Sequence, residues 1–364
     1  MTSRAGARRP FDQDGSASRP EPLRPARADR RSFDPDPAGR SHVQNREASP
    51  LGGQALIEGV MIRGARTWAT AVRHPDPEQF VDGVLPAGVP ATGEIVVETH
   101  RYRSALSRSP VLRLPILRGV VAIGASLRLG FRALRTSAAS QYEDPVELGP
   151  GTWIAAGLGA LVLVVGLFFL APVGLTGLLR GPLGADWLFW LVEGIVRTAI
   201  FLGYLLLVTR MSDLRRVFEY HGAEHQTIAC YEAGLPLTPE NAARCSRLHP
   251  RCGTSFLLLV MVVSIFVFAP LGTPPWPELI ASRIIGIPLI AGIAFELLRF
   301  AGRHQRFRPV RALTWPGLQL QRLTTRPPDH DQLAVAIAGL QAILAREDPR
   351  RADRRDRVGA EVAA

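Results

Sequence analysis

Four long apolar segments dominate the pattern of hydrophobic and polar positions along this chain. Each spans about 19 to 23 residues, and roughly 20 helical residues cover the ~30 Å hydrocarbon core of a bilayer. The segments are 152–171, 187–209, 253–271 and 282–300. This pattern predicts a mainly α-helical, polytopic membrane protein with about four transmembrane helices.

Arginine residues are concentrated on one side of these segments. They cluster before the first segment, in the loop 210–252 and after the fourth segment, whereas the other two loops hold only Arg180 and, at the edge of the fourth segment, Arg283. Basic residues flanking a transmembrane helix favour the cytoplasmic side. We therefore predict a multi-pass protein of the inner membrane, with both termini and the loop 210–252 in the cytoplasm.

The chain before the first apolar segment predicts two smaller elements. Residues 49–105 contain short β-like runs at 55–62, 67–73 and 94–99, separated by turns rich in Gly, Pro and Asp, which indicates a small cytoplasmic α+β module. Residues 110–138 predict an amphipathic helix on the anionic inner leaflet. Its arginines, within about a 100° arc, are Arg118, Arg128, Arg132 and Arg135. A fifth, weakly hydrophobic span is the alternative for this helix.

The remaining segments are polar or charged. Residues 310–345 predict a cytoplasmic C-terminal segment with a helix over 329–344. Residues 1–48 and 346–364 are rich in charged residues and have no apolar core, so we expect them to be disordered tails.

The sequence His221-Gly222-Ala223-Glu224-His225 is the strongest chemical signal. On a helix, the two histidines lie one turn apart on one face, which suits two imidazole ligands of one metal ion. Glu224 between them would be the general base toward a water that the metal activates. The order H-x-x-E-H is also that of inverzincin metallopeptidases.

A third metal ligand can come from either of two regions. His249 and Cys252 share the loop with the histidine pair, and Glu296 lies near the cytoplasmic end of the fourth apolar segment. Zinc accepts imidazole, thiolate and carboxylate ligands, so all three residues stay candidates. Without a metal, the two histidines would bond backbone carbonyls or lipid phosphates.

Two further carboxylates stand in unusual positions. Glu193 and Arg197 are four residues apart in the second apolar segment, which favours an ion pair within the membrane over a transport role. Glu58 lies in an apolar run punctuated by glycines. It either reaches the metal site as a base or ligand, or is a solvated strand residue paired with Arg63.

Charge and cysteine content narrow the possible partners. The formal net charge is +11, and all 43 basic residues are arginine. Because these arginines flank apolar segments and are not interleaved with aromatic residues, we expect the lipid bilayer, and no nucleic acid, as the partner. The three cysteines all lie within 230–252, which is not the pattern of a secreted disulfide framework. The oligomeric state is left open.

Several motifs together resemble one family, the YqhQ-like bacterial membrane proteins. The resemblance covers roughly residues 50 to 345, and its longest motifs are GGQALIEGVMIRG from Gly52, YHGAEH from Tyr220 and HPRCGTSF from His249. This family has no known function and is catalogued as predicted metal-dependent enzymes. The resemblance implies an integral membrane protein with a metal held by the HGAEH and HPRC residues. The family has Lys where this chain has Gln226, so a role needing a cation there does not carry over.

These observations favour a divalent-metal hydrolase, with zinc as the most suitable ion. The substrate would approach at the cytoplasmic membrane face, so a membrane-associated peptide or a lipid headgroup is the natural class. The alternative is a non-enzymatic membrane scaffold or transporter-like protein whose His/Glu/Cys cluster is structural or handles metal.

Overall fold

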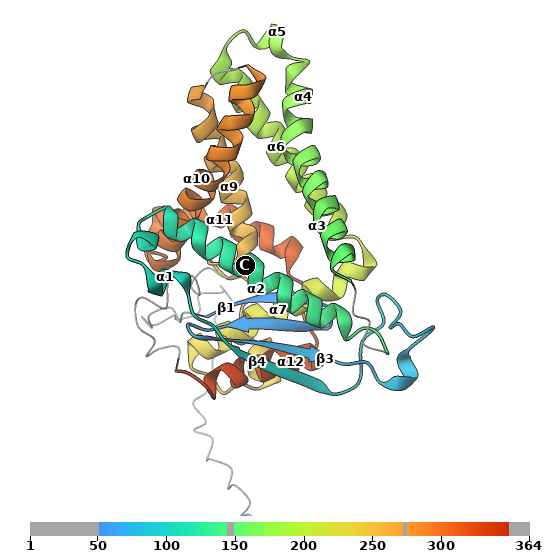
Figure 1. Ribbon diagram of the computed structural model, residues 1–364. Helices are drawn as coiled ribbons and strands as arrows, with labels where there is room; N and C mark the ends of the chain where they lie inside the picture. The colour runs from blue at the N-terminus through green and yellow to red at the C-terminus, as the bar shows by residue number, and fades with distance from the viewer. Residues whose placement is uncertain (1–50, 144–148, 272–274, 349–364) are drawn as a thin grey trace, which may run out of the picture. The chain divides into compact units, whose positions relative to one another are not determined.

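A computed structural model describes residues 51–143, 149–271 and 275–348 of the chain. The predicted tail 1–48 lies outside these residues, as does 346–364 apart from its first three positions. The described part is mainly helical with one small antiparallel sheet near the N-terminus, which confirms the fold class in its broad outline (Figure 1).

The sheet has four strands in sequential order, each antiparallel to the next. They are β1 (Gly52–Leu56), β2 (Gly59–Arg63), β3 (Thr67–Arg73) and β4 (Ile95–Arg101). Most side chains of β2 and β3 are buried, because helices cover both faces of the sheet. The helices that touch it are α2 (Leu117–Ala139), α7 (Ser212–Ala233) and α12 (His330–Leu344).

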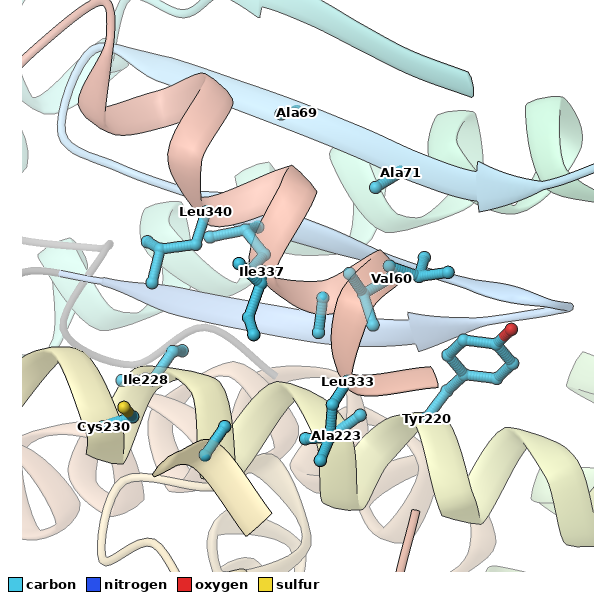
Figure 2. Close-up of a cluster of buried hydrophobic side chains, with 14 of the residues drawn as sticks. Val60, Ala69, Ala71, Tyr220, Ala223, Ile228, Cys230, Leu333, Ile337 and Leu340 are labelled. Atoms are coloured by element: carbon cyan, nitrogen blue, oxygen red, sulfur yellow. The ribbon is translucent and has the colours of Figure 1, made fainter. Parts of the chain in front are cut away.

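Alternate strand residues enter two different hydrophobic clusters. Val60 and Ile62 of β2 face α7 and α12, whereas Met61 between them faces α2. Figure 2 shows the first cluster, in which strand residues meet helices from the middle and the end of the chain. Its members include Ala69, Ala71, Tyr220, Ala223, Leu333, Ile337 and Leu340. The sheet therefore shares its core with α7 and α12 and is not a separate N-terminal module.

The predicted single strand 55–62 is a hairpin. β1 and β2 are joined by a tight turn in which Glu58 has a positive φ of 51°, a conformation uncommon for a residue other than Gly. The Glu58 carboxylate is buried and paired with Arg216 of α7, with 2.6 Å between Oε2 and Nη2. Glu58 is thus neither a ligand at the metal site nor a partner of Arg63, because its carboxylate forms an ion pair with Arg216.

Helix α2 lies on the opposite face of the sheet from α7 and α12 (Figure 1). Leu129 and Ala133 pack against the sheet, while the N-terminal end of α2 contacts α10 (Trp276–Arg303). The close approach of α2 to α10 depends on Gly119, where a Cβ would lie 2.8 Å from the Cβ of Phe295. The helix predicted over 110–138 thus forms a bridge between the sheet and the apolar helices.

Three helices are long and apolar enough to cross a membrane by length and composition, among the residues that the structure describes. These stretches are Gly151–Gly177, Trp187–Val208 and Ala281–Arg303. The first is built from α3 (Pro150–Val165), a π-helical turn and α4 (Ala171–Gly177), and the second lies in α6 (Asp186–Val208). The predicted segment 253–271 forms a shorter helix, α9 (Gly253–Phe268), followed by a 3₁₀ turn.

Short helices and one amphipathic helix complete the fold. Helix α11 (Arg308–Thr324) follows α10 and packs mainly on α9. Pro316 and Gly317 lie within it, and a Cβ on Gly317 would lie 2.8 Å from the Ser255 hydroxyl oxygen, so the glycine permits this contact. The bounds are α1 (Ala105–Arg108), α5 (Arg180–Leu183), α8 (Pro239–Ala243) and α11 (Arg308–Thr324).

Candidate metal site

His221 and His225 lie on one face of α7, as the helical spacing predicts. Their ring centroids are 4.5 Å apart in an edge-on arrangement. Helix α7 is held against the sheet by Tyr220 and Ala223, and the neighbouring Gly222 approaches the carbonyl of Arg326, where a Cβ would lie at 2.1 Å. Core packing on one face of α7 therefore directs the histidines toward the segment that follows α11.

Each imidazole is oriented by a backbone carbonyl. His221 Nδ1 lies 2.8 Å from the carbonyl oxygen of Thr324, and His225 Nδ1 makes a short contact with the carbonyl oxygen of Arg247. A carbonyl only accepts hydrogen bonds, so both Nδ1 atoms are donors. In a neutral imidazole this leaves the lone pair on Nε2, the arrangement that metal-binding histidines use.

Cys252 completes a cluster of three possible ligands. Its Sγ lies 3.4 Å from His221 Nε2, and the ligand atoms of His221, His225 and Cys252 all lie within 4.8 Å of one another. Cys252 is the N-cap of α9, a position where the helix dipole favours a thiolate. Among the described residues, this is the group of His, Cys, Asp and Glu side chains that could hold a metal ion.

Gln321 of α11 holds the turn that carries Cys252. The His249 backbone N–H donates to Gln321 Oε1 at 2.8 Å, and Gln321 Nε2 donates to the His249 carbonyl at 2.7 Å. Gln321 is completely buried and also donates to the Ser255 hydroxyl. This double hydrogen bond fixes the loop so that Cys252 faces α7.

Glu224 lies beside the cluster and is buried, with 4% of its surface exposed. Its Oε2 is 3.5 Å from His225 Nε2. It fits only because β1 carries Gly53 opposite it, where a Cβ would lie 2.5 Å from both Cγ and Oε1 of Glu224. The GGQALIEG motif and the HGAEH motif therefore meet in space.

Burial and mutual charge shift the pKa values of these groups. Burial raises the pKa of the Glu224 carboxyl, although the two histidines act against it. For Cys252 burial acts upward, but the charges of His221 and His225 dominate and lower the thiol pKa well below its usual range. Burial would lower the pKa of His225, yet the charges of Cys252 and Glu224 raise it to about 9. The cluster thus favours a thiolate, which is the form that binds metals.

Neither of the other two candidate ligands joins the three converging ligand atoms, although the His249 ring lies beside that of His225, with 5.6 Å between the ring centroids. His249 Nε2 is 3.2 Å from Arg251 Nη2 and 3.7 Å from Glu232 Oε2, and burial together with Arg251 lowers the His249 pKa. Glu296 on α10 forms a two-point ion pair with Arg118 of α2, in which Arg118 Nε and Glu296 Oε1 are 2.6 Å apart. Its carboxylate is therefore directed to α2.

Sequence reasoning missed the residues that support the cluster. Gln321 and Thr324 act through hydrogen bonds from a helix about a hundred residues after α7, and no local pattern indicates such contacts. Gly53 belongs to the GGQALIEG motif, but nothing in that motif indicates its contact with Glu224. Gln226 is buried beside His225, and its Nε2 donates to the carbonyl of Cys245 at 2.9 Å, so this position ties α7 to the loop.

The described part of the chain thus combines a small sheet covered by helices, apolar helices of membrane length, and a cluster of half-buried His221 with buried His225 and Cys252. The sequence profile of the family described as "protein of unknown function (DUF1385)" matches residues 114–346, and the chain belongs to this family. It is also similar to the "uncharacterized protein YqhQ" of Bacillus subtilis (strain 168), with 32% identity over 307 residues, 80% of this chain and 92% of the relative. No solved structure matches.

Proposed function

We propose that this chain is a metal-dependent hydrolase, with zinc as the ion, that acts at the cytoplasmic face of the inner membrane. The observation that carries the proposal is the convergence of three ligand atoms, from His221, His225 and Cys252, next to a buried carboxylate. Two imidazoles and a thiolate are ligands that zinc accepts readily. Three protein ligands are also typical of catalytic sites, which keep one position for water or substrate.

The residues of the site fit this chemistry without rearrangement. Both imidazoles have Nδ1 committed to carbonyl oxygens, so that Nε2 is the atom that would bind an ion. Because the pKa of His225 is raised to about 9, binding there would release a proton from Nε2. A bound divalent cation would supply a Lewis acid that polarises the bond to be cleaved and lowers the pKa of water. Glu224 Oε2 would accept the proton from that water and later return it to the leaving group.

Membrane placement rests on the three long apolar helices and on the connectivity of the core. Residues 51–97, 220–242 and 333–343 share one hydrophobic cluster, so they lie on the same side of a bilayer. The two connections between them must then each cross an even number of times. Helices α3 to α6 make one such pair of crossings, and α9 with α10 makes the other. Since α9 is 16 residues long, we infer that it crosses with the help of the following turn or where the bilayer is thin.

The alternative is a structural site in a non-enzymatic membrane scaffold. It is favoured by one observation, that Glu224 lies close enough to His225 Nε2 to act as a fourth ligand. Four protein ligands would close the site to water. The two functions therefore differ in what Glu224 does.

The deciding experiment measures metal content and hydrolysis on the detergent-purified full chain. We expect about one zinc ion per chain, lost in the His221→Ala/His225→Ala variant and kept in His249→Ala, which serves as the matched control because His249 pairs with Glu232. Glu224→Gln should keep the metal and lose hydrolysis of membrane-tethered peptides or lipid esters by about a hundredfold or more.

Each contrary result has a definite meaning. If no metal binds to the wild-type chain even with excess zinc, the metal site as proposed is wrong. If Glu224→Gln loses the metal along with the double variant, Glu224 is a ligand, and the structural alternative replaces the enzyme.

A further inference from the structure

Four arginines line a cavity next to the candidate metal site. The cavity has a volume of about 310 Å³. Arg210 follows α6, Arg247 belongs to the loop before α9, Arg322 is in the last turn of α11 and Arg326 lies just beyond it. No Asp or Glu lines the cavity, and none of these arginines forms an ion pair within the described part of the chain. Like charges brought together without a counterion indicate a site for an anion.

Two of these guanidinium groups are held in place by the backbone. Arg247 Nη1 donates to the carbonyl of Thr325 at 3.0 Å, and Arg326 Nη2 donates to the carbonyl of Thr209 at 2.7 Å. A guanidinium has five N–H donors, so each keeps several for a ligand. Arg210 and Arg322 are exposed at the rim. Two anchored and two exposed arginines can together donate to the oxygens of a phosphate group.

The apolar part of the cavity wall indicates that the phosphate belongs to a lipid. Leu206 and Leu323 line the cavity and are 42% and 37% exposed. Leu206 lies in the last turn of the second apolar stretch, where a span would leave the hydrocarbon core. Helix α11 also exposes Leu313 and Trp315, 68% and 60% respectively, as an interfacial helix does. The cavity would therefore lie at headgroup depth.

The cavity is separate from the cluster of His221, His225 and Cys252. None of these residues, nor Glu224, lines it. It is adjacent to the imidazoles, because Arg247 lines it and accepts from His225 Nδ1, and Thr324, which accepts from His221 Nδ1, directly precedes the lining residue Thr325. A second hollow of about 410 Å³ shares Arg247 and Arg322 and extends to Gln226.

We propose that this arginine cavity binds the phosphate group of an anionic phospholipid from the cytoplasmic leaflet. Binding requires neither the metal nor hydrolysis, but it rests on the membrane placement proposed above. A lipid held here would anchor α11 and the loop 247–252 at the bilayer surface, and thereby hold the metal site at a defined depth.

The test uses the full-length chain, purified and delipidated in detergent, with phosphatidylglycerol and phosphatidylcholine as probes. We expect the wild-type protein to bind phosphatidylglycerol at least about tenfold more tightly than phosphatidylcholine, as measured by native mass spectrometry. Arg210→Gln/Arg322→Gln should weaken that binding by about tenfold or more. These arginines make no side-chain hydrogen bond among the described residues, so the fold should persist, which thermal unfolding can check.

The matched control is Arg308→Gln/Arg311→Gln, which removes the same charge from α11 at exposed positions that do not line the cavity. It should change binding by less than about twofold. An equal loss of phosphatidylglycerol binding in both double variants would mean that diffuse surface charge, and not the cavity, binds the lipid. Equal binding of phosphatidylglycerol and phosphatidylcholine to the wild-type protein would also overturn the proposal. Displacement of the lipid by millimolar inorganic phosphate would assign the cavity to a soluble anion and overturn the lipid source.

Failure of the membrane placement would look different. A chain that stays soluble without detergent refutes the placement itself. A chain that needs detergent but shows no binding in the cavity refutes only this inference.

Discussion

At the scale of single residues, the contact between Gly53 and Glu224 decides the geometry of the candidate site. The glycine lies on β1 and the carboxylate on α7, which are far apart in the sequence. Any larger side chain at position 53 would occupy the space of the carboxylate. A residue with no charge and no functional group thus positions the proposed general base.

We predict that Gly53→Ala destabilises the protein by about 1–3 kcal/mol, because overpacking forces Glu224 or the strand to move. It should also reduce any hydrolysis, since the carboxylate would leave its place beside His225. The measurement is thermal unfolding in detergent together with the activity assay. Gly124→Ala is the control, because nothing lies within 4 Å of a Cβ there, and alanine favours the helix by about 0.5–1 kcal/mol. Equal behaviour of the two variants would contradict the close contact.

At the scale of elements, ion pairs between distant segments join the parts of the fold. Glu58 in the β1–β2 turn pairs with Arg216 of α7, and Arg118 of α2 pairs with Glu296 of α10. The first pair fixes the sheet against the helix that carries the histidines. The second fixes α2 against the apolar helices, at the place where Gly119 lets the two helices approach.

The pairing of Arg118 with Glu296 predicts that Glu296→Gln keeps the metal. The same variant should lower stability by about 1–3 kcal/mol, because it leaves the partly buried Arg118 without its counterion. A double-mutant cycle with Arg118→Gln should show positive coupling between the two positions. Metal analysis and thermal unfolding of the four proteins measure both effects. Loss of metal in Glu296→Gln alone would instead make Glu296 a ligand.

The ion pair between Glu232 of α7 and Arg251 predicts a specific acid sensitivity. Burial would raise the pKa of Glu232, but the hydrogen bond from His249 and the charge of Arg251 outweigh it and lower the pKa to about 2. A carboxyl group with a lowered folded-state pKa stabilises the fold above its ordinary value of 4.5, and this stabilisation is lost as the pH falls toward 2.

Wild type should therefore exceed Glu232→Gln in thermal stability at pH 6, by an amount that corresponds to about 2 kcal/mol, and most of the difference should vanish by pH 3. Measuring both proteins across this range cancels the acid response that they share. The control is Glu98→Gln, whose side chain is 51% exposed on β4 and should matter little at either pH. A difference that does not change with pH would show that the pair does not depend on the carboxylate charge.

At the scale of the whole molecule, the shared core restricts the topology. Because α2 packs on the sheet through Leu129 and Ala133, it lies on the same side as the sheet and does not serve as a fifth span in the proposed topology. Its N-terminal end packs on α10, so in the proposed topology we expect α2 to lie along the membrane surface.

Fusions of alkaline phosphatase, which is active only outside the cytoplasm, test this topology. We expect an inactive enzyme after Tyr142, an active one after Gly181 and an inactive one after Asp348, because the chain then crosses once between the first two points and returns. An active fusion after Tyr142 would mean that α2 crosses the membrane. A chain fused to green fluorescent protein at its end should fluoresce, which controls for expression.

Much of the molecule follows from the sequence by itself. Apolar length and helical spacing are local properties, so they predicted the helical class, the apolar helices and the shared face of His221 and His225. The choice between Cys252, His249 and Glu296 was left open, because it depends on which distant groups bind each side chain. In the tertiary structure Gln321 holds the loop so that Cys252 lies with the two histidines, and Arg118 pairs with Glu296, which is why we propose Cys252 as the third ligand. Only folding brings Gly53 to Glu224 and four arginines around one cavity, since those distances are set by packing and not by spacing along the chain.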